Sequence, residues 1–150
     1  MLQLSRKTLY ALEAVVDIAY NARPDPVQSK EIAERQGIPQ RYLEQVMQQL
    51  VRTGILRGVR GPRGGYRLAR ERRRITVADV VRVVAETDAD CGDETGCGSA
   101  LGHQVVRPLL DELQAELTAR LEAITIENLC QRASAAGIPA APRDHADFTI

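Results

Sequence analysis

With 150 residues the chain is long enough for one domain, and its 20 basic and 20 acidic side chains give a formal net charge of zero, which taken alone argues against binding to nucleic acid. The charge is unevenly distributed, however: residues 1–82 carry a net charge of +8 (16 basic, 8 acidic) and residues 83–150 a net charge of −8 (4 basic, 12 acidic), so the first half is expected to bind a polyanion. No apolar stretch approaches the ~18 residues of a membrane span, three cysteines are no disulfide framework, and 3% aromatic residues without Trp leave no platform for stacking single-stranded bases.

Three helices are predicted in the first third of the chain. Leu9, Leu12, Val16 and Ala19 recur at helical spacing and indicate a helix over 4–21, followed by a loop with two prolines. Ser29 is the predicted N-cap of a short second helix that ends at Gly37. The third helix, over 39–53, is amphipathic, with an apolar face of Leu43, Val46, Met47, Leu50 and Val51 and a polar face of Gln40, Arg41, Glu44, Gln45, Gln48 and Arg52.

A glycine-rich hairpin is predicted next, with strands over 55–60 and 66–69 and a connection over 61–65. Two helices, a glycine turn, an amphipathic helix and a hairpin form the order of a winged helix-turn-helix, whose amphipathic helix offers its polar face to the major groove of DNA. Gln and Arg can each bond a base in a two-point fashion, and arginines at the hairpin tip can clamp phosphates or enter a minor groove. The residues predicted to contact DNA are Ser29, Gln40, Arg41, Tyr42, Gln45, Arg60 and Arg63.

The second half is predicted to contain a sensor and a dimerisation element. Thr76 and Asp79 resemble a capping box that begins a helix. An acidic, glycine-rich loop over 86–102 lacks periodicity, and a long amphipathic helix follows with Val106, Leu110, Leu113, Leu117, Leu121 and Ile124. So little domain is left to cover this helix that a second copy is expected to do so. The predicted division is a DNA-binding domain over 1–85, the loop over 86–102, a dimerisation helix over 103–130 and a flexible tail over 131–150; the fold class is mainly α with a small β-wing.

Three strings resemble the IscR/NsrR-type family of winged-helix transcription regulators: Leu9-Tyr10-Ala11-Leu12, Tyr42-Leu43-Glu44-Gln45 and Arg60-Gly61-Pro62-Arg63-Gly64-Gly65-Tyr66. The string Ile124-Thr125-Ile126-Glu127-Asn128-Leu129 also matches, so the resemblance covers about residues 1–130. It implies a homodimer that reads a pseudo-palindromic operator in double-stranded DNA, with the long helix crossing to the partner subunit.

Cys91 and Cys97 lie in the glycine-rich loop, and thiolates suit iron–sulfur clusters. In the resembled family three cysteines at about this spacing ligate a [2Fe-2S] or [4Fe-4S] cluster. Here the third position falls at His103 or Gln104, so the metal ligands are predicted to be Cys91, Cys97 and His103, with a [2Fe-2S] cluster favoured because imidazole can replace thiolate on iron. The fourth ligand is open between Glu94, Asp93, Glu13 of the partner subunit and a small molecule.

Other interpretations of the loop remain open. The two cysteines could form a reversible disulfide switch, although acidic neighbours would raise the thiol pKa and slow it; they could bind zinc, or the loop could be cluster-free and the regulator controlled by a partner protein. Cys130, far along the chain, is predicted to be a buried structural cysteine.

Two broader alternatives complete the sequence-based prediction. No nucleophile–base arrangement or catalytic motif stands out, so no enzyme is predicted. A protein–protein module that retains the fold is the rival from another class. The N-terminal residues lack the apolar core of a signal peptide, which predicts a cytoplasmic protein.

Overall fold

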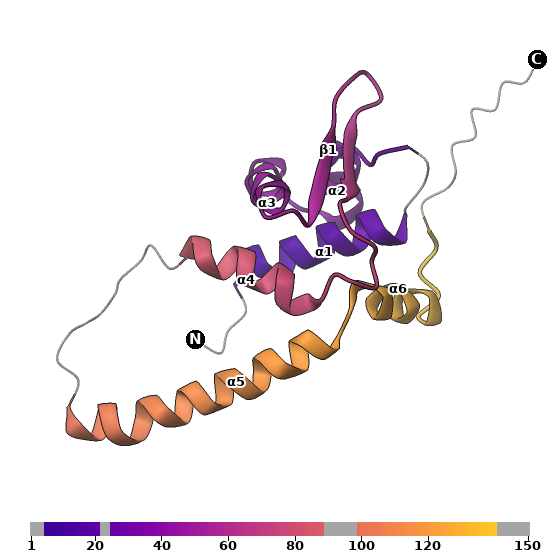
Figure 1. Cartoon of the computed structure of the whole chain (residues 1–150). Helices are drawn as coiled ribbons and strands as arrows, with labels where there is room; N and C mark the ends of the chain where they lie inside the picture. The colour runs from indigo at the N-terminus through magenta and orange to yellow at the C-terminus, as the bar shows by residue number, and fades with distance from the viewer. Residues whose placement is uncertain (1–4, 22–24, 89–98, 141–150) are drawn as a thin grey trace, which may run out of the picture.

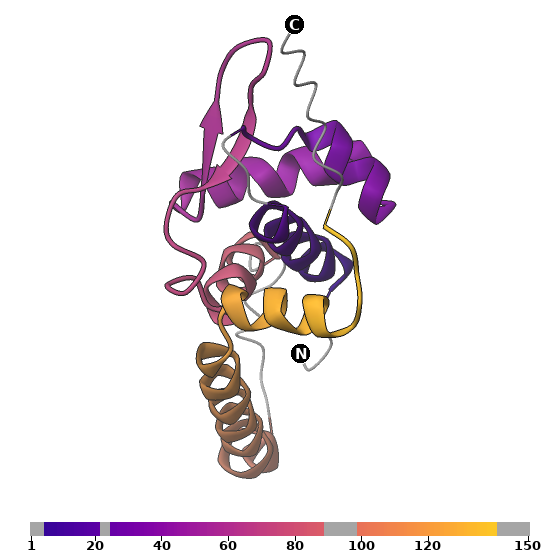
Figure 2. The ribbon, with the colours of Figure 1, turned by 90° about the vertical axis from the view of Figure 1, so that its right-hand side faces the viewer.

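The computed structural model describes residues 5–21, 25–88 and 99–140 and shows a mainly helical protein with one two-stranded sheet, which confirms the predicted fold class (Figure 1). Helix α1 (Arg6–Tyr20) lies at the centre. On one side of it lie α2 (Ser29–Gln36), α3 (Gln40–Arg52) and the hairpin, and on the other lie α4 (Val77–Asp88), α6 (Ile126–Ala135) and the long α5 (Arg107–Ala123) (Figures 1 and 2).

The core is built around the small side chains of α1. Ala11, Ala14 and Val15 are fully buried, and short side chains there let α3, α4 and α6 approach the helix closely. The helix predicted over 4–21 is confirmed as α1; of the side chains whose spacing indicated it, Leu9 is 52% exposed, and the face packed on the core follows Ala11, Ala14 and Ile18.

The helix-turn-helix begins and ends close to the predicted positions. Gly37 follows α2 with φ 64°, a left-handed conformation that glycine adopts without strain, and this turn leads into α3. Ser29, however, is the first residue of α2 and not its N-cap; that position is Gln28, whose side chain makes no capping hydrogen bond. The predicted N-cap was therefore wrong by one residue.

Strands β1 (Leu56–Val59) and β2 (Gly65–Leu68) form the antiparallel wing, with Val59 opposite Gly65 at the tip. The wing is tied to the residues before α2, because Val27 and Tyr66 exchange backbone N–H···O bonds of 3.0 and 2.7 Å. Gly65 permits this contact: a Cβ there would lie 2.6 Å from the carbonyl carbon of Val27.

The predicted capping box at the start of α4 is confirmed. The Asp79 carboxylate accepts a hydrogen bond from the Thr76 N–H at 3.0 Å, and the Thr76 hydroxyl accepts one from the Asp79 N–H at 3.2 Å. Helix α4 continues to Asp88, and helical structure resumes at Ala100, leading into η1 (Gly102–Val106) and α5. Both ends of the predicted 86–102 loop are therefore helical.

The prediction of a single helix over 103–130 is wrong, because the helix is interrupted at Ile124 and Thr125, between α5 and α6. Thr125 and Asn128 form a capping box that begins α6. The break is held in place by backbone bonds of 2.9 Å from the Val77 N–H to Ile124 and from the Ile126 N–H to the oxygen of Ile75.

The tail predicted from residue 131 is helical to Ala135, and the chain is described as far as residue 140. Among the described residues, none of the helices has the length and apolar character needed to cross a membrane.

Candidate functional site

Helix α3 presents a polar face away from the core. Its buried positions are Leu43, Val46, Met47 and Leu50, each at most 3% exposed, as the amphipathic pattern predicted. The residues predicted to contact DNA in this helix are all exposed: Gln40, Arg41, Tyr42 and Gln45. Gln40 also donates a hydrogen bond of 3.2 Å to Glu44, which places a carboxylate, an acceptor for the cytosine amino group, in the middle of this face.

The wing tip carries Arg60 and Arg63, and both side chains are exposed. The backbone at the tip is closely packed. A Cβ at Gly64 would lie only 2.8 Å from the oxygen of Gly61, so this turn requires glycine. In both views the hairpin extends on the same side of α1 as α3 (Figures 1 and 2). The two elements that carry the residues predicted to contact DNA, α3 and the wing, therefore lie on one side of the molecule.

Ser29, the remaining predicted contact, is half-buried at the first turn of α2. Helix N-termini offer free backbone N–H groups to phosphates. The exposure of Ser29 is compatible with such a role, which stays a prediction.

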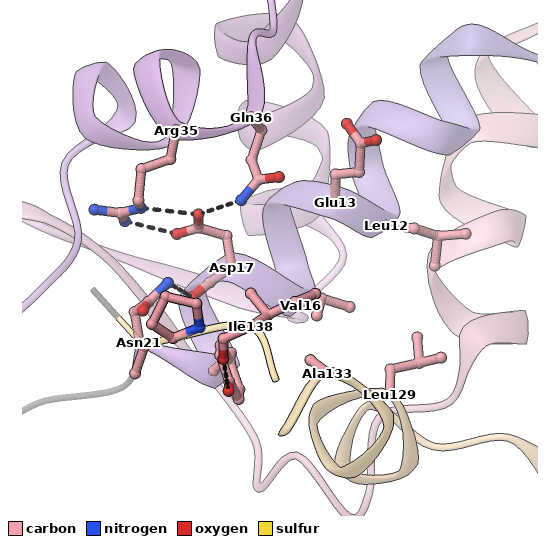
Figure 3. Close-up of a pocket in the computed structure, with 13 residues that line it drawn as sticks. Leu12, Glu13, Val16, Asp17, Asn21, Arg35, Gln36, Leu129, Ala133 and Ile138 are labelled. Atoms are coloured by element: carbon pink, nitrogen blue, oxygen red, sulfur yellow. Dashed lines mark hydrogen bonds and ion pairs between the residues drawn. The ribbon is translucent and has the colours of Figure 1, made fainter. Parts of the chain in front are cut away.

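Asp17 was not among the predicted functional residues, although it fixes the position of α2. Its fully buried carboxylate accepts hydrogen bonds from Arg35 Nε at 3.0 Å, Arg35 Nη2 at 2.7 Å and Gln36 Nε2 at 2.8 Å (Figure 3). The hydrogen bond with Asp17 raises the pKa of Arg35. A charged residue on the buried face of an otherwise apolar helix was the sequence signal that could have identified it.

Several basic residues of the first half are paired with acidic groups and not directed at a ligand. Arg72 forms an ion pair with Glu127 of α6, and Arg82 forms one with Glu122 of α5. By contrast, Arg60 and Arg63 form no ion pair within the described ranges. Arg60 and Arg63 are therefore better able to contact phosphate groups than Arg72 and Arg82, whose side chains are already paired.

Of the predicted metal ligands, the structure describes only His103. Cys91 and Cys97 lie outside the described residues, as do Asp93 and Glu94. His103 is exposed in η1, a few residues after the point where the described chain resumes. Glu13 lies half-buried on α1, where burial raises its pKa. Within the described ranges no three His, Cys, Asp or Glu side chains are grouped as a metal site would require.

Cys130 is a free thiol, 4% exposed, in α6. Burial raises its pKa, and the nearby Arg72 partly opposes this effect. A protonated, buried thiol is unreactive, in agreement with the structural role predicted for it.

Comparisons with known proteins agree with this arrangement. Residues 4–132 match the model of the Rrf2 family, described as an iron-dependent transcriptional regulator. The HTH-type transcriptional regulator IscR of Xenorhabdus nematophila is 38% identical over 130 residues, which cover 85% of this chain and 79% of that protein. Among solved structures, IscR of T. potens superposes with a TM-score of 0.74 at 33% identity (93% of this chain, 94% of that one), and CymR, the global cysteine regulator of B. subtilis, with 0.71 at 26% identity (88% and 98%).

Proposed function

The chain belongs to the Rrf2 family of transcriptional regulators, and from this premise we propose that it binds a pseudo-palindromic operator in double-stranded DNA as a cytoplasmic homodimer. The observation that carries the proposal is that α3 and the wing lie on the same side of α1 (Figure 2), and that the polar residues of α3 and the arginines of the wing tip are exposed. A helix-turn-helix protein uses such a helix in the major groove, while flanking elements hold the phosphates.

Within this interface each predicted residue has a distinct role. Gln40, Arg41, Tyr42 and Gln45 would lie along the base edges, where Arg recognises guanine and Gln recognises adenine. Arg60 and Arg63 would contact phosphates or a minor groove beside the site, and Ser29 a phosphate at the start of α2.

The homodimer is supported by the exposed apolar side chains of η1 and α5. None of the residues of these two helices is buried. Seven large apolar side chains here and just before η1 are 36–66% exposed: Leu101, Val105, Val106, Leu109, Leu110, Leu113 and Leu117. A second copy of this helix would cover them, and the resulting dimer would have two α3 helices for two half-sites, which on DNA lie about 34 Å apart in successive major grooves.

We also propose that Cys91, Cys97 and His103 hold a [2Fe-2S] cluster. Two thiolates and one imidazole suit iron, the His103 side chain is exposed, and the family is described as iron-dependent. When bound, the cluster would supply a reversible one-electron redox change. All three positions lie in the sequence between α4 and α5. Ligation would therefore join the DNA-binding half to the dimer helix and alter the spacing of the two α3 helices.

The DNA-binding proposal can be tested by selecting duplexes from a random pool with the purified protein and measuring affinity by fluorescence anisotropy at several salt concentrations. The Arg60→Ala/Arg63→Ala variant is expected to lower the slope of log K against log salt by about 2, roughly one per lost phosphate contact. Arg132→Ala, an exposed arginine on α6, is the control and should leave the slope unchanged. If no duplex is selected, with or without metal, the proposal is wrong.

The cluster proposal is tested by anaerobic purification with absorbance, iron and sulfide assays. Cys91→Ser and His103→Ala are each expected to lose the cluster, whereas Cys130→Ala should retain it. A protein without iron after anaerobic reconstitution would reject the cluster, and a full cluster in His103→Ala would reject this ligand set.

A cluster-free, thiol-controlled regulator is the second candidate, favoured by the structural similarity to CymR, the global cysteine regulator of B. subtilis. It predicts that Cys91 and Cys97 form a disulfide on mild oxidation of an iron-free protein and that operator affinity changes with it. Mass spectrometry of oxidised and reduced protein distinguishes the two candidates.

A further inference from the structure

A cavity of about 840 Å³ lies between α1, α2 and α6 (Figure 3). Its walls are mainly apolar and are formed by Leu12, Val16, Tyr20, Leu129, Ala133 and Ile138. This volume is within the range of about 300–1,000 Å³ that small-molecule sites occupy, and such sites are usually apolar with a few polar groups.

Most of the polar groups at this cavity already have partners. The Asp17 carboxylate is bonded by Arg35 and Gln36, and the Tyr20 hydroxyl donates a hydrogen bond to the oxygen of Ile138. Glu13 differs, because its carboxylate forms no hydrogen bond or ion pair within the described part of the chain. The cavity therefore combines apolar walls with one carboxylate, that of Glu13, which has no partner among the described residues (Figure 3).

A carboxylate of this kind favours a cationic ligand. Burial raises the pKa of Glu13, which shows that the surroundings disfavour its bare charge. A ligand ammonium group would supply up to three hydrogen-bond donors and the compensating charge, and the Tyr20 ring on the wall offers a further contact to a cation. An anionic ligand would meet the uncompensated Glu13.

We propose that the cavity between α1, α2 and α6 binds a small organic cation, an amine with an apolar body, whose ammonium group pairs with Glu13 while its apolar part packs against Leu12, Val16 and Leu129. The occupant would also contact Arg35 and Gln36 of α2, the helix that precedes α3. Such a ligand would therefore contact the helix-turn-helix directly and could change the position of α2. This regulatory consequence rests on the proposed function, but the binding itself does not.

Isothermal titration of the full chain with three matched compounds tests the binding without DNA. The probes are 2-phenylethylamine, 3-phenylpropionate and 3-phenylpropan-1-ol, which share an apolar body and differ in charge. The amine is expected to bind at least about tenfold more tightly than the carboxylate, because one partly buried, charge-assisted hydrogen bond contributes about that factor. Equal binding of amine and carboxylate would overturn the proposal.

Variants locate the site. Glu13→Gln should weaken amine binding about tenfold and leave the alcohol unaffected, whereas Glu34→Gln, which changes an exposed carboxylate of α2 outside the cavity, should change neither. Ala133→Trp should occupy the part of the cavity beside Leu129 and weaken binding of all probes, with circular dichroism checking its fold. Amine binding that is unchanged in Glu13→Gln, or that appears only after the dimer is broken by a charge in α5, would overturn the proposal; the latter outcome would show that a second copy covers the cavity.

Because this titration contains no DNA, its failure would leave the operator-binding proposal intact. Conversely, a chain that binds the amine but no duplex would retain this site and lose the proposed function.

Discussion

The Asp17 carboxylate lies on the buried face of α1 and is bonded by two side chains of α2. Removing a charge from water is costly, and the bidentate bond from Arg35 together with the bond from Gln36 offsets this cost. Asp17 therefore helps to fix where α2 lies on α1, next to α3, with which α2 also packs. At this position a buried charge contributes to the geometry of the helix-turn-helix.

Asp17→Asn should destabilise the fold by about 1–3 kcal/mol, because it weakens three charge-assisted hydrogen bonds and leaves Arg35 without its buried counter-charge. Arg35 is 30% exposed, so water limits the loss. The measurement is urea unfolding followed by circular dichroism. The matched control is Glu31→Gln, which removes the exposed partner of Arg35 at 3.9 Å and should cost less than about 0.5 kcal/mol. Equal losses in the two variants would contradict this account of Asp17.

Cys130 gives the stability a dependence on alkaline pH. Its pKa is raised by burial in the fold, while in the unfolded chain a thiol titrates near about 8.5. Above this pH the unfolded state loses a proton that the folded state retains, so the free energy of unfolding should fall as the pH rises toward the folded pKa. Cys130→Ala should cost roughly 1 kcal/mol at neutral pH and show a shallower decline above pH 8.5. Parallel curves for the variant and the unaltered protein would exclude this effect.

At the scale of elements, the wing is held by close backbone contact. The pairing of Val27 with Tyr66 joins β2 to the residues before α2 and so ties the wing to the helix-turn-helix. Gly65 lies directly against this contact. We therefore expect this contact to limit movement of the wing arginines relative to α3.

Gly65→Ala should separate β2 from Val27, since the added methyl group would lie 2.6 Å from the Val27 carbonyl carbon. We expect a loss of about 1–3 kcal/mol in unfolding free energy and a roughly tenfold loss of operator affinity from displacement of Arg60 and Arg63. Gly58→Ala in β1 is the matched control, because a Cβ there meets no atom within 4 Å. Urea unfolding and anisotropy titration measure the two effects, and a Gly58→Ala variant as impaired as Gly65→Ala would contradict the explanation.

The elements that could be predicted are those that local sequence determines. Gly37, the apolar stripe of α3 and the Thr76–Asp79 box each act over a few residues, and these features lie where they were expected. The break at Ile124 was missed because the apolar spacing from Leu121 continues across it, while the deciding bonds come from residues 75–77, far away in the sequence.

The candidate site was predictable only in part, for the same reason. The exposure of Arg41 and Tyr42 follows from helical periodicity, since the opposite face of α3 is apolar. The pairing of Asp17 with Arg35 spans 18 residues and depends on how α1 and α2 pack. The pairing of Arg72 with Glu127, which removes one arginine from the basic set, likewise depends on the placement of α6.

At the scale of the whole molecule, the net charge of zero is the sum of two opposite halves. Among the described elements, the wing and α3 lie on one side of α1, and α5, which has more acidic than basic residues, lies on the other (Figure 1). An ion pair between Arg82 and Glu122 ties α5 to α4. The acidic side chains of α5 therefore lie away from the proposed DNA face, where they would repel phosphate.

The proposed dimer depends on the apolar side chains of α5, and Leu113, 40% exposed, lies near the middle of this set. Leu113→Glu should weaken the dimer by roughly 10- to 100-fold, because each of two leucines loses the burial of the 40% of its surface that the single chain leaves exposed, a part of the roughly 1.5–3 kcal/mol of a full burial, and the two new carboxylates repel each other. Sedimentation should show a monomer at micromolar concentration. Affinity for a full operator should fall, while the weak affinity for a half-site is retained. Ala115→Glu adds the same charge on the opposite face of α5 and should remain dimeric. A dimeric Leu113→Glu variant with full operator affinity would show that α5 is not the interface.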